Sequence, residues 1–227
     1  MTSHIQAQDL TIVLPTRNEA QSISKVIDEI RALPVRCNIL VMDGLSTDGT
    51  DKIALNKGVK VLYESRKGKG VAFRSSLEFV ETPYVVMVNA DYTYPLEYTQ
   101  TIYGLLKMGK YDVVIGCREL KEEGSMSAAN TLGNFLLSTL ASILYGHRIY
   151  DVCSGMWGFR LGILKKFNLT SMGFTLEADL FSNAIRNKCR ICQIPIGYRP
   201  RLEGSKAKLK MLDGFKIAWF LIKRRFR

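Results

Sequence analysis

The sequence alternates between short apolar runs and longer segments in which apolar residues recur every three or four positions. The short runs lie at residues 10–14, 38–42, 59–63, 84–88 and 112–115, and their β-branched content predicts strands buried on both faces. The periodic segments predict helices at 22–33, 51–57, 72–80 and 96–107. This alternation predicts an α/β fold, with a mostly parallel, doubly wound sheet and helices on both faces.

The second half of the chain has longer helical segments, predicted at 127–145, 177–187 and 211–226, with strands within 151–160 and at 190–194. In the first of these helices, polar and apolar residues fall on two different sides. The polar side carries Asn130, Asn134, Ser138 and Ser142, and the apolar side carries Leu132, Leu136, Leu140 and Ile143. We expect a main domain at 1–206 and a basic amphipathic C-terminal helix at 207–227.

Charge is concentrated near the C-terminal end. The chain of 227 residues has a net charge of +11, and residues 199–227, with ten Lys/Arg and two Asp/Glu, carry +8 of it. A basic end of this kind narrows the partners to something anionic, such as phosphate, a membrane surface or nucleic acid. We find no recognised nucleic-acid-binding motif and expect no nucleic-acid partner.

The cysteines and the apolar runs exclude several classes of protein. Five scattered cysteines argue against a disulfide framework. The pair Cys189 and Cys192 stands in a chain with two histidines, which disfavours a zinc site. Residues 1–9 are polar and give no indication of a signal peptide. No apolar run is long enough to cross a bilayer, so we expect no transmembrane helix.

Polar residues follow each predicted strand of the first half, and ligands of doubly wound sheets bind at the carboxyl ends of the strands. Turn and cap chemistry accounts for Gly44, Gly49 and the Asp48–Thr50 pair. It accounts poorly for Asp43 and Asp91, which come directly after buried strands. A carboxylate in such a place either forms a turn or binds something cationic.

Eight segments occur in a fixed order along residues 13–206. They are VLPTRNEA (13–20), VMDGLSTDGT (41–50), KGKGVAFRSSL (67–77), VNADYTYP (88–95), GCREL (116–120), DVCSGMWGFR (151–160), GFTLEADL (173–180) and IPIGYRPRLEGSK (194–206). This ordered set resembles the inverting glycosyltransferases of family 2, which have the GT-A fold. Within them it is most similar to the enzymes that make polyprenyl-phosphate sugars, such as dolichyl-phosphate mannosyl- or glucosyltransferases.

The resemblance implies a pocket for a nucleotide-sugar donor, with UDP and GDP both open. Pro15, Arg17 and Glu19 would line the base and ribose pocket, and Asp43 would hydrogen-bond the base. On this resemblance, residues 1–206 would form the catalytic domain.

The resemblance also implies a divalent metal, Mg²⁺ or Mn²⁺, on the diphosphate of the donor. Asn89-Ala90-Asp91 stands where the family usually has Asp-x-Asp, so Asp91 would be the main metal ligand. Hard oxygen donors suit such a cation, which neutralises charge on the departing nucleoside diphosphate. Asn89 would also ligate the metal through its amide oxygen, but it departs from the pattern because the amide brings no charge. Thr93 would complete the site through its hydroxyl or through water.

A polyprenyl-phosphate acceptor would need cations rather than a general base, because a phosphate monoester is already ionised at neutral pH. Arg118, Arg201 and Lys206 are the candidates for holding it, with Arg199 less clearly so. Asp151 and Glu177 would serve either as a base for a hydroxyl acceptor or to orient an arginine, and we favour the second role.

The C-terminal helix fits a lipid acceptor. Six apolar residues lie roughly along one side, namely Met211, Phe215, Ala218, Trp219, Ile222 and Phe226. The helix is also basic, with Lys216, Lys223, Arg224, Arg225 and Arg227. This pattern predicts a helix lying on an anionic membrane and a peripheral protein on the cytoplasmic side. The alternative is a helix docked on the core with a charged tail.

Two other functions remain open from the sequence. One is a glycosyltransferase that acts on a soluble or saccharide acceptor. The other, from a different class, is a basic non-enzymatic protein that binds nucleic acid or anionic lipid.

Overall fold

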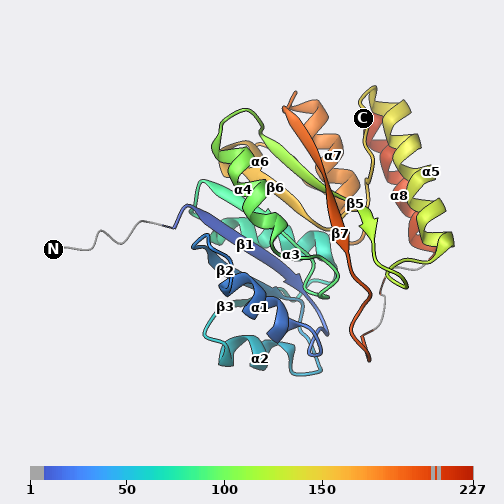
Figure 1. Cartoon of the computed structure of the whole chain (residues 1–227). Helices are drawn as coiled ribbons and strands as arrows, with labels where there is room; N and C mark the ends of the chain where they lie inside the picture. The colour runs from blue at the N-terminus through green and yellow to red at the C-terminus, as the bar shows by residue number, and fades with distance from the viewer. Residues whose placement is uncertain (1–7, 206–207, 209–210, 227) are drawn as a thin grey trace.

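The fold is built around one sheet of seven strands, in the order β3-β2-β1-β4-β6-β5-β7. The structure, a computed structural model, describes residues 8–205, 208 and 211–226. Helices cover both faces of the sheet (Figure 1). The predicted α/β fold with a mostly parallel sheet is confirmed, and the C-terminal helix is present.

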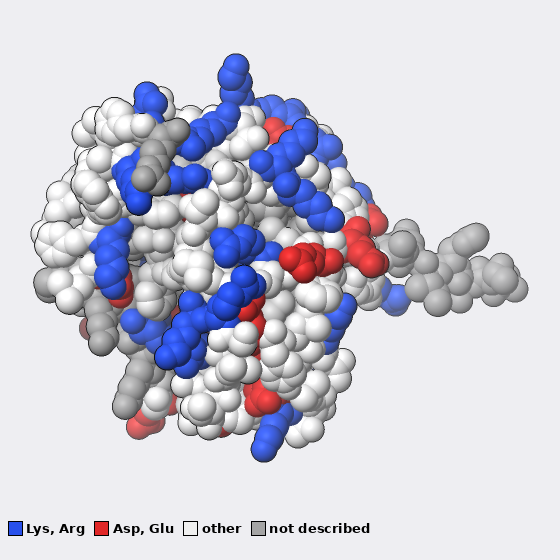
Figure 2. Space-filling model, turned by 180° about the vertical axis from the view of Figure 1, so that it is seen from behind, with Lys and Arg blue, Asp and Glu red and all other residues white. Residues whose placement is uncertain are grey.

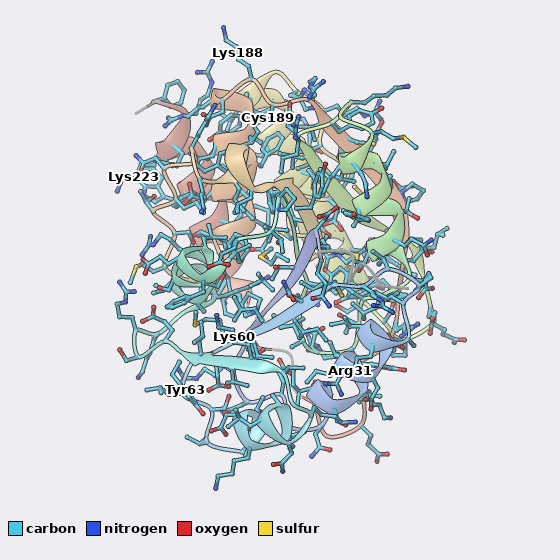
Figure 3. The ribbon with its side chains drawn as sticks, turned by 90° about the vertical axis from the view of Figure 1, so that its left-hand side faces the viewer. Arg31, Lys60, Tyr63, Lys188, Cys189 and Lys223 are labelled. Carbon is cyan, nitrogen blue, oxygen red and sulfur yellow. The ribbon has the colours of Figure 1, made fainter. Side chains whose placement is uncertain are left out.

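The strands agree with the predicted segments and extend several of them. They are β1 (Leu10–Thr16), β2 (Asn38–Asp43), β3 (Lys60–Tyr63), β4 (Tyr84–Met87), β5 (Val113–Lys121), β6 (Trp157–Arg160) and β7 (Ile191–Tyr198). β5 and β7 are longer than predicted because they pair in parallel with each other as far as Lys121 and Tyr198. β3 is an edge strand, and its Tyr63 lies near one end of the molecule in Figure 3.

Two layers of helices enclose the sheet. The helices are α1 (Ile23–Arg31), α2 (Thr50–Asn56), α3 (Lys69–Ser76), α4 (Tyr98–Lys107), α5 (Ala128–Tyr145), α6 (Leu161–Leu164), α7 (Leu176–Arg186) and α8 (Met211–Arg225), with a short 3₁₀ turn, η1 (Leu77–Phe79), after α3. α1 and α4 contribute to one hydrophobic cluster, and α3, α5, α7 and α8 contribute to the other.

The alternation of side chains along β1 explains the two layers. Val13 points into one cluster, whereas Ile12 and Leu14 point into the other, and all three are fully buried. A strand buried on both faces has no polar side, which is why the run appeared in the sequence as continuously apolar.

β6 is the one strand, within the part of the chain described, that runs against its neighbours. It pairs antiparallel with both β4 and β5, and its first residue, Trp157, lies beside Met87 and Ile115. The residues just before β6 therefore reach the same edge of the sheet as the carboxyl ends of β4 and β5. This edge is called the rim below, and it carries residues 15–20, 43–46, 64–70, 89–93, 116–118 and 151–156.

The helices α5 and α8 pack side by side at the far side of the sheet from α1 and α2 (Figure 1). Ile217 and Leu221 of α8 are buried in the core, so this helix is docked on the fold. In α5 it is Ser138 and Ala141 that are buried, while Leu132, Leu136 and Ile143 are exposed. The polar side of α5 thus faces the protein, and its apolar side faces outward.

Candidate active site

Asp91 lies at the centre of the rim and forms an ion pair with Arg201. Its side chain is 4% exposed, and one carboxylate oxygen lies 2.6 Å from a guanidinium nitrogen of Arg201. The other oxygen accepts a hydrogen bond of 2.6 Å from the hydroxyl of Thr93, which is fully buried. The sequence analysis assigned Asp91 to the metal and Arg201 to the acceptor phosphate. The fold brings these two side chains into contact.

The segment after β1 lies next to Asp91. Glu19 is buried and forms an ion pair with Lys208, whose ammonium also contacts the backbone oxygens of Arg17 and Asn18. Burial raises the pKa of Glu19 above its ordinary value, although Lys208 acts against this rise. Two cations from the part of the chain after β7, Arg201 and Lys208, therefore contact acids of the rim.

Backbone contacts position the end of β1 and the segment that follows it. Pro15 lies within β1 beside Met42 of β2, and the Arg17 side chain is exposed. The carbonyl oxygen of Ala90 accepts a hydrogen bond of 2.7 Å from the hydroxyl of Ser22, which ties the start of α1 to the end of β4. These contacts bring the predicted donor-binding residues from β1 and β4 to adjacent positions.

Asp43 is fully buried at the end of β2 and shapes the loop that follows. Its two carboxylate oxygens accept hydrogen bonds from the backbone nitrogen of Ser46, at 2.7 Å, and from its hydroxyl, at 2.6 Å. These bonds help to hold Leu45 at a φ of 57°, in the left-handed region that side chains other than glycine rarely adopt. Asp43 thus orders a rim loop, and its contact with a base stays a prediction.

Asn89 contacts a lysine that the sequence analysis did not single out. Lys69, the first residue of α3, donates a hydrogen bond of 2.6 Å to the side-chain oxygen of Asn89 and forms an ion pair with Glu177. The glycines on either side of Lys69, in a polar segment that follows a strand, were the available signal in the sequence. Its partner Glu177 is 108 residues away and could not be inferred.

Arg118 is held at the rim by Asp151. The Arg118 side chain donates two hydrogen bonds of 2.7 Å to the two carboxylate oxygens of Asp151, and its backbone nitrogen donates a third. Burial alone would raise the pKa of Asp151, but the charge and hydrogen bonds of Arg118 outweigh it, and the pKa lies below its ordinary value. Asp151 orients an arginine, as the sequence analysis favoured.

The other predicted acceptor cations differ in what the structure says of them. Arg199 pairs with Glu29 at 2.7 Å and lies over the ring of Tyr92, which is a structural role at the edge of the rim. Lys206 lies outside the described residues. Of the predicted set, the structure therefore brings Arg118 and Arg201 to the rim.

The donor atoms at the rim fit a divalent cation with a single carboxylate ligand. In the described part of the chain there is no group of three or more His, Cys, Asp or Glu side chains that could hold a metal by themselves. Mg²⁺ and Mn²⁺ sites of this kind take one or two carboxylates plus substrate phosphates and waters. Asp91 fits that role because it already attracts the positive charge of Arg201, whereas the Asn89 oxygen is held by Lys69.

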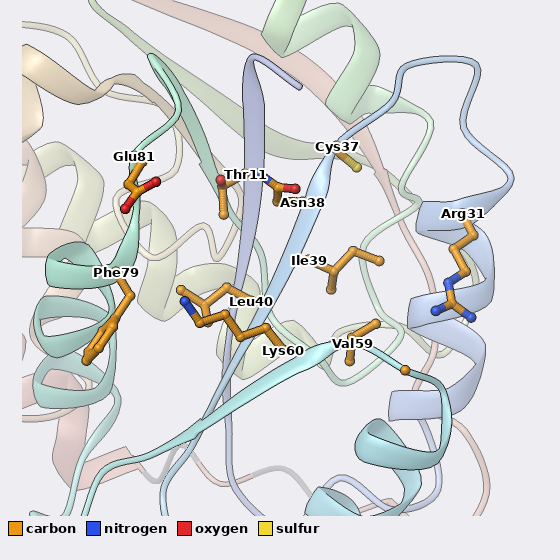
Figure 4. Close-up of a pocket in the computed structure, with 11 residues that line it drawn as sticks. Thr11, Arg31, Cys37, Asn38, Ile39, Leu40, Val59, Lys60, Phe79 and Glu81 are labelled. Carbon is orange, nitrogen blue, oxygen red and sulfur yellow. The ribbon is translucent and has the colours of Figure 1, made fainter. Parts of the chain in front are cut away.

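One hollow in the surface lies away from the rim. It has a volume of about 480 Å³ and is lined by residues at the amino ends of β1, β2 and β3, among them Thr11, Asn38 and Lys60 (Figure 4). None of the rim residues lines it. We place the functional site at the rim, because the paired acids and cations gather there.

Comparison with known proteins decides the family. Residues 11–167 match the family described as Glycosyl transferase family 2. The chain belongs to glycosyl transferase family 2. A dolichyl-phosphate hexose transferase of Haloferax volcanii is 34% identical over 199 residues, covering 87% of this chain and 86% of that protein. Glycosyltransferase AglJ of the same organism is 33% identical over 216 residues, covering 94% and 71%.

Solved structures of two sugar-phosphoglycerate synthases share the fold. Mannosyl-3-phosphoglycerate synthase from Rubrobacter xylanophilus superimposes with a TM-score of 0.76 at 20% identity, covering 96% of this chain and 73% of its own. Glucosyl-3-phosphoglycerate synthase from Mycobacterium tuberculosis, in complex with Mn²⁺, UDP and its product, gives a TM-score of 0.73 at 22% identity, covering 96% and 78%. These TM-scores show that the chain has the GT-A fold. The protein is a glycosyltransferase.

Proposed function

We propose that this family 2 glycosyltransferase moves a sugar from a UDP- or GDP-linked donor to a polyprenyl or dolichyl phosphate, with inversion at the transferred carbon. The observation that carries the proposal is that both candidate bases, Asp151 of the rim and Glu177 of α7, are paired with cations. Asp151 is bound by Arg118 through two hydrogen bonds, and Glu177 is bound by Lys69. Neither is free to take a proton from a hydroxyl acceptor, whereas a phosphate needs no base.

The donor would lie along the rim segments from β1, β2 and β4. Glu19, Arg17 and Pro15 would face the base and ribose, beside the loop that Asp43 orders. Asp91 would hold a Mg²⁺ or Mn²⁺ ion, which when bound supplies positive charge to the departing diphosphate. Asp91 itself orients that charge, because Thr93 fixes one of its two oxygens.

The acceptor phosphate would lie on the other side of the reacting carbon, among the arginines. Arg118 is oriented by Asp151, and Arg201 comes from the segment after β7. Arg201 forms an ion pair with Asp91, so it would lie where the donor and acceptor charges meet. Fixed cations there stabilise two anionic groups as they approach, which is the main electrostatic demand of this reaction.

The lipid part of the acceptor is supported by an apolar surface on α5 and α8, here called the apolar face. It consists of Leu132, Phe135, Leu136 and Ile143 on α5, of Leu212, Phe215 and Trp219 on α8, and of Phe226 directly after α8, each more than half exposed. Leu212, Phe215 and Trp219 are separated by three and four positions, which places them on one side of the helix. Each such side chain that leaves water contributes at most about 1.5–3 kcal/mol.

Charge favours a lipid surface as the partner of the apolar face. Lys223 lies at the outer edge of the molecule (Figure 3), and Lys216 and Arg225 of the same helix are exposed. On the face seen in Figure 2, lysine and arginine side chains are spread widely, and acidic side chains are fewer. Basic residues beside an apolar surface are typical of proteins that lie on anionic membranes. Within the described residues no helix is long and apolar enough to cross a membrane.

The acceptor is tested with purified protein, Mn²⁺ and a panel of UDP- and GDP-sugars, with product detected by mass spectrometry. We expect transfer to polyprenyl phosphate and none to the matching polyprenol, because the reacting group is the phosphate. Transfer to a saccharide hydroxyl at a comparable rate would contradict the proposal. Salt-sensitive nucleic-acid binding without nucleotide-sugar binding would favour the non-enzymatic alternative.

The apolar face is tested with vesicles that contain phosphatidylglycerol. We expect Leu136→Glu on α5 and Trp219→Glu on α8 each to lower the bound fraction several-fold, because a charge in the contact opposes burial. Both side chains point outward, so the melting temperature should stay unchanged. Met108→Glu is the matched control, since Met108 is 70% exposed after α4, away from the apolar face.

Unchanged vesicle binding by both α5 and α8 variants would contradict a membrane contact at this face. A wild-type dimer in solution that these two variants convert to a monomer would instead identify the face as a contact between two copies. Substitution is the cleaner test here, because deleting α8 would also remove Ile217 and Leu221 from the core.

A further inference from the structure

Asn89 stands where the family usually carries the first acid of its metal motif, and its side chain does something else in this fold. We propose that Asn89 is a positioning residue for Lys69, and that the Lys69 ammonium contacts the diphosphate of the donor. The proposal rests on the proposed function, because it concerns the nucleotide-sugar site. On this proposal, the Lys69 side chain supplies positive charge to the donor diphosphate at this part of the rim.

The contacts of Lys69 define the arrangement. Its ammonium lies 2.6 Å from the side-chain oxygen of Asn89 and pairs with Glu177, and the side chains of Lys69 and Glu177 are 14% and 8% exposed. An ammonium has three N–H donors. Asn89 and Glu177 take two of them, and the structure shows no third acceptor among the described residues. One N–H donor of Lys69 therefore stays available to a ligand. That donor lies beside Asn89, which is two residues before Asp91 in the chain.

Gly155 keeps the Asn89 amide in this orientation. A Cβ atom at position 155 would come within 2.4–2.6 Å of the nitrogen, carbon and oxygen of the Asn89 amide. The Gly155 backbone nitrogen donates a hydrogen bond of 2.6 Å to the hydroxyl of Tyr94, which is buried at 1% exposure. The segment before β6 is thus fixed against Asn89, and the amide packs directly on its backbone.

The choice of an amide follows from charge. Lys69 and Glu177 together are neutral, and the Asn89 oxygen accepts a hydrogen bond without adding negative charge. An aspartate at position 89 would give the group a net charge of −1, facing an anionic diphosphate. The amide therefore keeps the ammonium in place and leaves its charge available to the donor.

The test measures binding of UDP, and of GDP in parallel, by calorimetry in EDTA, and Mn²⁺ binding without nucleotide by electron paramagnetic resonance. In EDTA we expect Lys69→Met and Asn89→Asp each to weaken nucleotide binding about tenfold or more, as the loss of a charge-assisted hydrogen bond would. Asn89→Ala should weaken nucleotide binding as well, yet leave Mn²⁺ affinity within about twofold of the wild-type value.

Controls separate the possible outcomes. Lys67→Met removes an exposed lysine from the same motif and should bind nucleotide as the wild-type protein does. Gly155→Ala, checked by its melting curve, should act like Asn89→Ala through displacement of the amide. If Gly155→Ala does not fold, the Asn89 variants carry the test.

The results that overturn the inference are distinct from those that overturn the proposed function. A large loss of Mn²⁺ affinity in Asn89→Ala would make Asn89 a metal ligand. Wild-type nucleotide binding by Lys69→Met, or no metal-free binding by the wild-type protein, would remove Lys69 from the diphosphate. If neither UDP nor GDP binds even with Mn²⁺, the proposed function itself fails.

Discussion

Replacing Asp91 with alanine is expected to lower kcat for sugar transfer by about 100- to 1000-fold, the loss typical of removing one group that stabilises developing charge. Asp91 is the carboxylate at the rim proposed to orient the metal on the departing diphosphate, and its position is fixed by Thr93. The fold should survive, because Asp91 lies after β4 and outside the hydrophobic clusters. The prediction is checked by measuring turnover of the variant by mass spectrometry and its Mn²⁺ binding by electron paramagnetic resonance.

Asp28→Ala is the matched control for Asp91→Ala. Asp28 is also paired with a cation, Lys57, but its side chain is 54% exposed and lies on α1 away from the rim. We expect near-wild-type turnover from Asp28→Ala. Turnover by Asp91→Ala within a few-fold of the wild type, or undiminished activity of the wild type in excess EDTA, would contradict the role given to Asp91.

Replacing Arg224 with alanine is expected to destabilise the protein by about 3 kcal/mol, because it breaks a buried ion pair. Arg224 of α8 lies 2.8 Å from Asp179 of α7, and their side chains are 11% and 0% exposed. Asp179 also accepts hydrogen bonds from the backbone nitrogens of Thr170 and Ser171. For a domain of this size the loss corresponds to a fall in melting temperature of roughly 6–12 °C, measured by calorimetry.

Lys223→Ala provides the comparison for Arg224→Ala, because it removes an exposed cation from the adjacent position of the same helix. We expect its melting temperature to stay within about 1 °C of the wild type. Equal effects of the two substitutions would mean that α8 is attached to α7 without the Arg224–Asp179 pair. A larger fall in melting temperature for Lys223→Ala than for Arg224→Ala would mean that Lys223 attaches α8 to the fold.

The fold was predictable where the sequence carries local periodicity. The continuous apolar runs of β1, β2 and β4 and the stripe formed by Ile23, Val26 and Ile27 are local patterns, and each became the predicted element. The antiparallel direction of β6 was not predictable in the same way. It depends on pairing with strands that lie about 45 and 70 residues earlier in the chain, which no local pattern records.

The candidate site was predictable as a set of residues, and its pairing was not. Asp43 and Asp91 stood out because each directly follows a buried strand. The contacts of Lys69 with Glu177 and of Arg201 with Asp91 join residues more than 100 positions apart. Likewise, the two-sided pattern of α5 did not reveal that Ser138 accepts a hydrogen bond from the backbone nitrogen of Val152 inside the fold.

The position of β6 has a consequence for how such enzymes can diversify by recombination. The proposed donor contacts all come from residues before 94, and the proposed acceptor contacts come from residues after 116. The two halves meet along the antiparallel pairing of β4 with β6. A chimera with its crossover between β4 and β5 could take the chain up to β4 from one enzyme and the chain from β5 onward from another. It would then have the donor preference of the first enzyme and the acceptor contacts of the second. Lys69 and Glu177 sit on opposite sides of that crossover, so they would have to be inherited as a pair.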